Sequence, residues 1–486
     1  MAGRRKQAHH QVTFAVLAAA AGGYALLQSL VVPVLPTIQA GLHTSQNTVT
    51  WVLTAYLLSA SVCTPIVGRL GDMWGKERFL VVTLVALAVG SLLGALAGNI
   101  TVMIVARVIQ GVGGGVMPLS FGIVRDEFPR ERVVGAVGII AALAAAGAGL
   151  GIVLAGPIVG ALDYHWLFWL PMIVVSAAAV AAHFFVPESP VRAPGRISWP
   201  GVLLLSGWLV ALMLGVSEAP AWGWGSAQVI GLVVGGLVLA GVWVVVESRS
   251  PSPLVDMRLM RLPTVWTTNL VALLFGVGMY AVLAFLPELV QTPASAGYGF
   301  GASITESGLM VLPLSILMFA FGILSGPLSR RYGAKAVLVV GAAISAASFV
   351  LLATATGHKW EIVVAMTIEG IGFGLAFSAM SSLVVEGVPA EHTGVASGMN
   401  ANIRTIGGSI GTAVMSSIVT AGVRSGSFPP KSGYTNGFTM LAVVTVAAAL
   451  AAVVVPNIRP AAQVEELHHA ELGLLAGGTL AGDEPE

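Results

Sequence analysis

The sequence predicts an all-α integral membrane protein with fourteen transmembrane helices: two six-helix bundles with two extra helices between them. The first observation is composition, because 56% of the 486 residues are hydrophobic and 9% are charged, against about 25% charged residues in a soluble domain. The second is a series of fourteen apolar segments, each near the roughly 20 residues that cross a bilayer as a helix. The third is a charged loop that occurs twice, after the second and the tenth segment.

The apolar segments are expected to be helices because a helix satisfies its own backbone hydrogen bonds inside lipid. The first segment follows MAGRRKQAHH and has a signal peptide as its alternative. Its apolar run exceeds the usual core of about 7–15 residues, so we interpret it as a retained helix. The predicted spans are residues 12–36, 49–70, 79–98, 101–125, 133–161, 165–186, 199–217, 227–246, 265–290, 304–328, 336–356, 361–385, 395–421 and 437–456.

Lysine and arginine predict the orientation, because they are retained on the cytoplasmic side of a membrane. With the N-terminus in the cytoplasm, eighteen of them fall in inner loops and tails and only Lys359, Arg424 and Lys431 in outer loops. An odd number of spans would destroy this bias. We therefore expect fourteen spans and both termini in the cytoplasm. The Arg, Ala, Gly and Val content indicates a GC-rich genome, and hence a bacterial cytoplasmic membrane.

The repeated loop divides the chain into two similar blocks. GRLGDMWGK starts at Gly68 and GPLSRRYGAK at Gly326, each after the second helix of a block. Pro-rich, charged linkers bracket the seventh and eighth spans. The expected units are an N-terminal six-helix bundle (1–190), a two-helix central insert with linkers (191–262), a C-terminal six-helix bundle (263–457) and a cytoplasmic tail (458–486).

The first copy of the loop resembles a motif of the major facilitator superfamily. That motif reads Gly-x-Leu-x-Asp-x-x-Gly-x-Arg/Lys-Arg/Lys and lies between the second and third helices. In this chain Lys76 is basic one position early, and Glu77 departs from the pattern. The matching residues are Gly68, Leu70, Asp72, Gly75 and Arg78.

Two other segments resemble motifs of the same superfamily. Arg107-Val-Ile-Gln110-Gly-Val-Gly is similar to its Arg-x-x-Gln-Gly-x-Gly motif in the fourth helix. Gly156-Pro157-Ile-Val-Gly160 is similar to a motif associated with antiporters, with Ala161 in place of the last glycine. Fourteen spans with a central pair resemble the 14-helix drug:proton antiporter branch. The resemblance implies a major-facilitator-type fold, in which substrate binds near the midplane between halves that rock.

The charged loop is expected to act as a conformational latch. Gly68 and Gly75 permit a sharp turn between antiparallel helices, and Lys76 and Arg78 hold the loop on the inner side. Topology does not require Asp72. The resemblance implies that this acid engages a neighbouring helix end in one conformation and releases it in the other. A carboxylate there gains about 0.3–1 kcal/mol from the helix dipole; a solvated acid in a basic loop is the alternative.

The antiporter-type segment of the fifth span combines glycine rows with a proline. Small residues four apart let helix backbones approach closely in lipid, and Pro kinks a helix. A glycine-lined kink that faces the other half would seal and open one side of a cavity; static packing is the alternative. The residues of this motif are Gly147, Gly151, Gly156, Pro157 and Gly160.

Three charges lie well inside predicted spans: Arg107, Glu369 and Arg404. Each costs at least about 2.5–3.5 kcal/mol in the bilayer, so such residues face an interior cavity and have partners. The resemblance implies that Arg107 assists proton coupling. Glu369 is the best-placed acid in the C-terminal half to bind a proton or a cation. A structural pair, for example Glu369 with Arg404, is the alternative.

The first span departs from the drug branch, whose members often carry an aspartate there. This chain has Leu27 or Gln28 at that position, and neither titrates. Coupling must then use another acid or an altered stoichiometry; Glu288, near the outer end of the ninth span, is a second candidate acid, with a solvated helix end as its alternative. Gln28 is expected to hydrogen-bond substrate. Polar and aromatic residues expected along the pathway are Tyr24, Tyr56, Gln110, Trp208, Tyr280, Asn400 and Asn402.

Enzyme chemistry is not expected. Gly407-Gly-Ser409-Ile-Gly411 matches a nucleophile elbow, but an elbow needs a strand–turn–helix setting and this segment lies in a predicted span. The single cysteine, Cys63, excludes an intramolecular disulfide and a cysteine-cluster metal site. We expect no metal and no cofactor.

The predicted function is export of small amphipathic or cationic compounds by proton antiport with alternating access, that is, multidrug efflux of the kind that causes antibiotic resistance. The expected partners are the substrate, protons and membrane lipid, without nucleic acid, and we expect a monomer driven by the proton gradient. One alternative is an exporter of a specific metabolite, lipid or sugar with the same fold. Another is a membrane scaffold or sensor that transports nothing.

Overall fold

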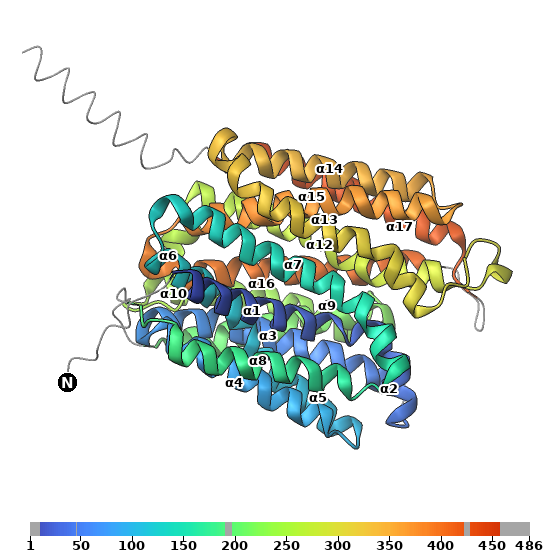
Figure 1. The fold of residues 1–486 in the computed structure, drawn as a ribbon, viewed down its shortest axis with the longest axis horizontal. Helices are drawn as coiled ribbons and strands as arrows, with labels where there is room; N and C mark the ends of the chain where they lie inside the picture. The colour runs from blue at the N-terminus through green and yellow to red at the C-terminus, as the bar shows by residue number, and fades with distance from the viewer. Residues whose placement is uncertain (1–9, 45, 190–196, 422–427, 457–486) are drawn as a thin grey trace, which may run out of the picture.

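The computed structural model describes residues 10–44, 46–189, 197–421 and 428–456, and it is helical with no strand in these ranges. Long helices lie side by side along one common direction (Figure 1). The N-terminal helices are α1 (His10–Ser29), α2 (Leu35–Gly41), α3 (Gln46–Trp74), α4 (Lys76–Ala95), α5 (Ile100–Gly111), α6 (Val116–Glu127), α7 (Arg130–Ala161) and α8 (Trp166–Phe185).

The remaining helices form the insert and the C-terminal half. The insert contains α9 (Trp199–Trp222), α10 (Ala227–Arg249) and the short α11 (Met257–Met260). The C-terminal half contains α12 (Pro263–Gln291), α13 (Ile304–Tyr332), α14 (Ala334–Thr354), α15 (Lys359–Glu386), α16 (Thr393–Val419) and α17 (Lys431–Val454). Four 3₁₀ turns join helices: η1 (Val32–Val34), η2 (Val112–Gly115), η3 (Ala294–Ala296) and η4 (Ala390–His392).

Thirteen helical segments of the described chain are long and apolar enough to cross a membrane, and each coincides with a predicted span. The fourteenth predicted span, 395–421, is α16, which has 27 residues but carries polar side chains along its length. Asn400, Asn402 and Arg404 lower its hydropathy, and all three face the protein rather than open solvent. The all-α class with fourteen long helices is therefore confirmed, with the most polar helix placed inside the protein.

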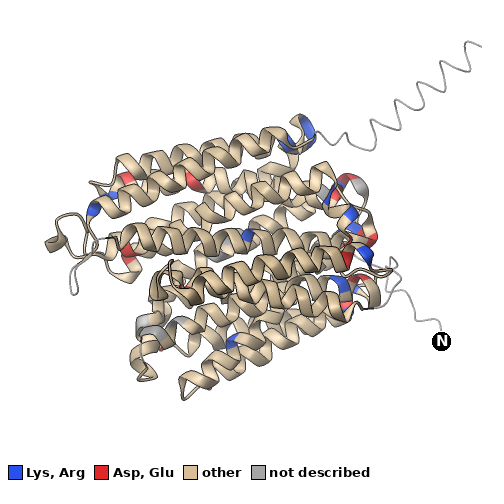
Figure 2. Ribbon diagram, turned by 180° about the vertical axis from the view of Figure 1, so that it is seen from behind, with Lys and Arg blue, Asp and Glu red and all other residues tan. Residues whose placement is uncertain are grey.

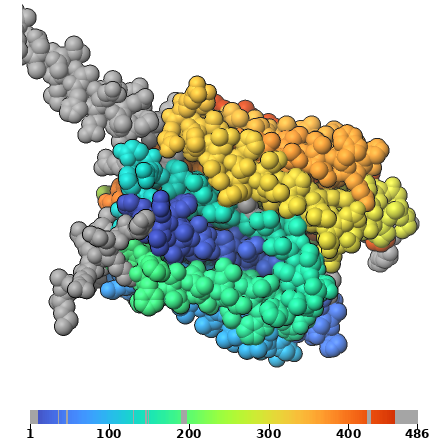
Figure 3. Space-filling view, viewed as in Figure 1, coloured from blue at the N-terminus to red at the C-terminus, as the bar shows by residue number. Residues whose placement is uncertain are grey.

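The two halves pack against each other mainly along two pairs of helices, and α7 with α15 and α6 with α16 add further contacts. Within the N-terminal half, α1 contacts α7 and α8, and α4 contacts α5 and α8. Within the C-terminal half, α13 and α14 contact α15, and α12 contacts α16 and α17. Between the halves, α7 lies against α13 and α3 lies against α16. Figure 3 shows the first of these contacts from outside, where the teal α7 meets the yellow α13.

The fourth span is divided into α5 and α6 by the 3₁₀ turn η2. Its glycines are buried where other helices come closest: a Cβ at Gly113 would overlap Leu87 of α4, and one at Gly114 would overlap Thr64 of α3. Glycine is weak in a helix interior, so the helix changes pitch here. The motif around Arg107 thus brings three helices together at this level.

The insert covers the seam between α3 and α16, because α9 contacts both of these helices. Trp208 of α9 packs against Trp243 of α10, with ring centroids 5.9 Å apart. Trp208 therefore lies in the packing of the insert and not in a central pathway, which corrects the sequence-based expectation. Aromatic side chains of its size pack as readily between helices as they line a cavity.

Charged residues gather at one end of the bundle, the end at which α1 begins (Figure 2). Few lie along the middle of the helices. This distribution is the one that a chain with lysine- and arginine-rich inner loops produces, and below we call this end the inner face.

Candidate functional site

At the inner face, Asp72 of α3 reaches across to the C-terminal half. Its side chain is completely buried, and its Oδ2 accepts a hydrogen bond of 3.1 Å from the backbone N–H of Val395. Val395 lies in the first turn of α16, which begins at Thr393. The free N–H groups and the dipole of a helix N-terminus favour a carboxylate. Asp72 therefore joins the two halves at this end.

Lys76 holds the other side of this acid. Its buried Nζ lies 3.6 Å from Asp72 Oδ1 and 2.6 Å from Asp126 Oδ2 at the end of α6. The Ser189 hydroxyl also donates to Asp126. Lys76 was expected in the loop, but its partner Asp126 lies 50 positions away along the chain and was not predicted.

Arg78 and the loop glycines have different environments. Arg78 Nε lies 3.3 Å from Glu188 Oε2 and is mostly exposed, so this pair adds little stability. Gly75 has a φ of 123°, which L side chains rarely adopt. A Cβ on Gly68 would lie 2.7 Å from the carbonyl oxygen of Gly394, so α3 and α16 touch through their backbones.

The second copy of the loop lacks the acid. Gly333 ends α13 with a φ of 87°, as Gly75 does after α3. The residue that corresponds to Asp72 is Arg330, which is exposed. The backbone turn is thus repeated in both halves, whereas the buried acid at a helix end belongs to the first half alone.

Arg125 adds a second bridge at the inner face that the sequence analysis missed. It lies in the last turn of α6, and its guanidinium donates to the Val385 carbonyl of α15 and, over 3.1 Å, to Thr393 Oγ1 of α16. In the sequence it is one of many inner-loop arginines, and no local pattern distinguishes it. Asp72 and Arg125 together fasten α3 and α6 to the start of α16.

His392 lies directly before α16 and next to these bridges. Burial lowers the pKa of His392, and the nearby Arg69 lowers it further, while Glu391 and Asp256 act in the opposite direction. A proton therefore binds His392 less readily in this closed arrangement than in a state that exposes the ring. Above the ordinary histidine pKa of about 6.5, the protonation of His392 does not affect the stability of the closed arrangement. As the pH falls from there through the lowered pKa of His392, the closed arrangement loses stability relative to the state that exposes the ring.

We expect acidification of the inner face to loosen the closed arrangement. The measurement is the reactivity of Ser397→Cys, on a Cys63→Ser background, with an impermeant maleimide added at that face between about pH 5.5 and pH 7.5. Ser397 is 6% exposed, so its reactivity reports opening. Reactivity should rise at acidic pH relative to the same protein with His392→Gln, and identical pH profiles would contradict the expectation.

The glycines of the antiporter-type motif lie on two faces of α7. A Cβ on Gly147 would lie 2.9 Å from Ala25 Cβ, and one on Gly151 would overlap Ser29, so these two face α1 of the same half. Gly156 faces the other half, since its Cβ would lie 2.8 Å from Thr305 Oγ1 of α13. Gly160 has open space around it, and Pro157 lies within the helix. One motif glycine thus faces the opposite half.

Arg107 is completely buried on α5 of the N-terminal half. Its Nε donates to the Val52 carbonyl over 2.9 Å, and its Nη1 donates to Gln110 Oε1 over 2.8 Å. Gln110 Nε2 in turn donates to Ser91 Oγ over 3.0 Å. The guanidinium lies 4.3 Å from the centre of the Tyr56 ring. The cation is therefore held by neutral groups and an aromatic face.

Arg404 has a similar environment in the C-terminal half. Its guanidinium lies 4.4 Å from the centre of the Phe377 ring, and Nη1 is 3.5 Å from Asn400 Oδ1. Asn400 Nδ2 donates to Asn269 Oδ1 over 2.9 Å. Asn269 of α12 is a member of this network that the sequence analysis did not single out. Tyr280 lies on the neighbouring face of α12, with its ring against Gly408 of α16.

A small cavity of about 20 Å³ lies between the two halves next to Arg404. Met117 and Phe121 of α6 line it from one half, and Phe377, Ser381, Asn400 and Arg404 line it from the other. This volume holds about one water molecule. A drug-sized ligand needs a few hundred Å³, so the halves must separate before one can bind here.

Glu369 lies away from this cavity. It is completely buried on α15, beside Ser345 and Ser348 of α14. Neither carboxyl oxygen has a well-aligned hydrogen bond within the described chain. The structure does not pair it with Arg404: Arg404 stacks on Phe377, which is eight positions further along α15, about 12 Å at 1.5 Å per residue.

The other predicted pathway residues are spread over the molecule. Leu27 is completely buried in the core, and Gln28 is half-buried on α1. Glu288 is exposed near the outer end of α12, where it accepts a hydrogen bond of 3.0 Å from the Tyr434 hydroxyl. Asn402 Nδ2 donates to the Ser61 carbonyl over 2.6 Å and so joins α16 to α3.

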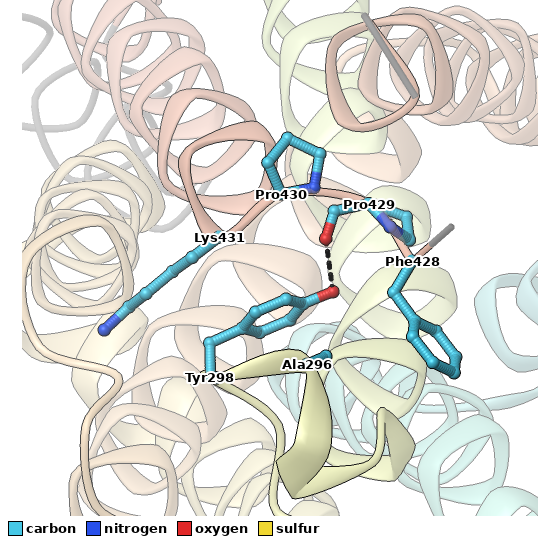
Figure 4. A pocket seen from close by; sticks show the side chains of 7 residues that line it. Ala296, Tyr298, Phe428, Pro429, Pro430 and Lys431 are labelled. Carbon is cyan, nitrogen blue, oxygen red and sulfur yellow. Dashed lines mark hydrogen bonds between the residues drawn. The ribbon is translucent and has the colours of Figure 1, made fainter. Parts of the chain in front are cut away.

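A larger open cleft of about 550 Å³ lies at the outer end of the C-terminal half (Figure 4). There the Tyr298 hydroxyl donates to the Pro429 carbonyl over 2.6 Å, beside Phe428 and Lys431. All of its lining residues belong to the loop after α12 or to the segment that leads into α17. It is therefore not between the halves, and the smaller central cavity is the better candidate for a transport site.

Two helical bundles that meet along several helix pairs and share a small cavity lined from both halves form the architecture of a membrane transporter. The chain belongs to the major facilitator superfamily, whose family model matches residues 17–412 and 268–477. The membership predicted from the three motifs is thus confirmed.

Several characterised relatives are exporters. The tetracenomycin C resistance and export protein of Streptomyces glaucescens is 30% identical over 82% of this chain and 74% of its own. The cephamycin export protein of Amycolatopsis lactamdurans is 30% identical over 93% of this chain and 94% of its own. A multidrug transporter of Bacillus subtilis is 28% identical over 78% of this chain and 69% of its own.

A solved structure has the same fold. The human organic anion transporter MFSD10 superposes with a TM-score of 0.68 over 92% of this chain and all of that one, at 16% sequence identity. The likeness at this identity shows the fold alone. The chain is therefore a multi-pass membrane transporter of the major facilitator superfamily, related to antibiotic and multidrug exporters.

Proposed function

We propose that this protein exports small amphipathic compounds across a bacterial cytoplasmic membrane by proton antiport with alternating access. Both termini would lie in the cytoplasm, the protein would act as a monomer, and the proton gradient would supply the drive without a cofactor. A proton that moves inward down 100 mV releases about 2.3 kcal/mol. Relatives named for the export of tetracenomycin C, cephamycin and multiple drugs support this substrate range.

The observation that carries the proposal is the cavity between the halves. It is lined from both bundles and has room for about one water, while Asp72 and Arg125 hold the inner face closed. A site of this kind binds a ligand only when the bundles move apart. Rocking of two halves about a midplane site is how alternating access operates.

Glu369 is the proposed proton carrier. It is the buried acid in the middle of the described helices, and no basic side chain contacts it there. Burying an unpaired carboxylate is costly unless it is neutralised. Movement of α15 that brings water to Ser345 and Ser348 would load or release the proton. Glu288 is a weaker choice because it is exposed and hydrogen-bonded at the outer end.

The test uses everted vesicles that are energised and followed with a pH-gradient dye while amphipathic compounds are added. We expect some compounds to collapse the gradient in the wild type. Glu369→Gln should reduce this response at least about tenfold, because glutamine cannot carry a proton. Glu131→Gln is the matched control, since Glu131 is exposed at the start of α7.

The variants distinguish a defect in proton coupling from a defect in the conformational change of transport. Asp72→Asn should slow the response without removing proton exchange, since it weakens the inner-face contact. A full response in Glu369→Gln would move the proton site elsewhere and make Glu288→Gln the next variant. Failure of every compound with correctly inserted protein would overturn drug antiport and favour a specific metabolite, lipid or sugar as substrate.

A further inference from the structure

The charges buried inside the two helical bundles are unbalanced. Arg107 and Arg404 lie there, one in each half, and neither forms an ion pair with any residue of the described chain. The ion pairs that the described residues do form lie toward the ends of the helices. A buried cation in a membrane protein is normally paired, so these two need an explanation.

Both guanidinium groups keep an unused donor. Arg107 Nη2 and Arg404 Nε are buried and have no hydrogen-bond partner among the described residues. The contact between Arg404 and Asn400 is 3.5 Å long, at the limit of a hydrogen bond. An unsatisfied buried donor on a charged group is expensive to maintain. At Arg404 this unused donor lies beside the cavity, where a bound ligand can supply the acceptor.

The cavity next to Arg404 has the chemistry to receive an anion. Its polar lining consists of Arg404, Asn400 and serine hydroxyls, and no carboxylate is among the lining residues. Its apolar lining, Phe377, Phe121 and Met117, comes from both halves. Arg107 lies over the Tyr56 ring of α3, and α3 packs against α16, the helix that carries Arg404.

Resting on the proposed function, we propose that the exported compound is an organic anion. Its anionic group binds the guanidinium of Arg404 beside Asn400, and its apolar body lies between Phe377 and the residues of α6. Arginine binds carboxylates through two parallel hydrogen bonds and is the side chain best suited to this task. Arg107, which the opposite half contributes, adds positive potential without direct contact. The cationic substrates expected from the sequence find no acidic partner in this cavity.

The test uses the full-length protein in proteoliposomes with an imposed pH gradient. The probes are matched triplets of a carboxylate, its primary amide and the corresponding primary amine, on naphthyl, biphenyl and anthracenyl bodies. We expect the carboxylates to be transported at least about tenfold faster than the amides or the amines. Arg404→Gln should remove this preference, Arg404→Lys should retain part of it, and Arg261→Gln, at an exposed arginine, should leave it unchanged.

Each outcome decides the proposal. Transport of the amines or amides at the rate of the carboxylates, or a carboxylate preference that survives Arg404→Gln, would overturn the organic-anion inference and leave proton-coupled export in place. No transport of any triplet would count against both the inference and the proposed function. Thermal unfolding of each variant in detergent shows whether a loss comes from failure to fold, and Arg404→Lys keeps the test valid if Arg404→Gln does not fold.

Discussion

Replacing Gly68 with leucine is expected to hold the inner face open and to reduce export at least tenfold. A Cβ at this position would lie 2.7 Å from the Gly394 carbonyl oxygen and 2.9 Å from its carbon. These are backbone atoms of α16, which cannot turn aside as a flexible side chain would. Overpacking of a close contact costs about 1–3 kcal/mol, and about 1.4 kcal/mol changes a population tenfold. The closed state should therefore no longer be the most populated conformation.

Export in everted vesicles and maleimide labelling of Ser397→Cys measure the two consequences. Labelling should increase because the contact between Asp72 and Val395 can no longer form. Gly241→Leu is the matched control, since a Cβ at Gly241 on α10 meets nothing within 4 Å. Wild-type export by the Gly68→Leu protein would show that the two backbones need not touch during transport.

Most of the fold could be predicted from the sequence because hydropathy and charge act locally. The predicted spans 336–356 and 361–385 correspond to α14 (Ala334–Thr354) and α15 (Lys359–Glu386). The least apolar helix, α16, was still found by its length and by the alternation of loops. Hydropathy does not show how each helix is rotated about its own axis. This rotation decides which side chains face the site.

The partners in the site show this limit. The motif identified Asp72. Its hydrogen-bond donor, the backbone N–H of Val395, lies 323 positions away along the chain and could not be predicted from the motif. Glu369 and Arg404 were considered as a pair because both are buried charges of one half. Glu369 instead faces α14, and the aromatic ring that Arg404 covers lies further along α15. The glycines of α7 were expected to line a kink that faces the other half, whereas Gly147 and Gly151 face α1 and Gly156 faces α13.

Arg107→Leu is expected to reduce export at least a hundredfold while changing the stability of the protein little. The substitution leaves the Val52 carbonyl and the Gln110 amide oxygen without their donor, at about 1–3 kcal/mol each. It also removes a buried charge that no acid compensates, and replacing such groups with apolar ones is often neutral. The lost hydrogen bonds lower the stability of the protein, whereas removal of the uncompensated buried charge raises it. In transport the two effects add, because the positive potential of the guanidinium and the hydrogen bond that positions α5 against α3 are lost together.

Arg107→Lys and Gln110→Met separate the charge from its hydrogen bonds. Lysine retains the charge but lacks the planar fork that reaches both Val52 and Gln110, so we expect an intermediate loss of export. Gln110→Met keeps Arg107 and removes one acceptor, and it should lose less than Arg107→Leu. Export assays and thermal midpoints of the three variants provide the comparison. If Arg107→Leu exported like the wild type, Arg107 would serve only to pack α5 against α3, and the positive potential at the midplane would come from Arg404 alone.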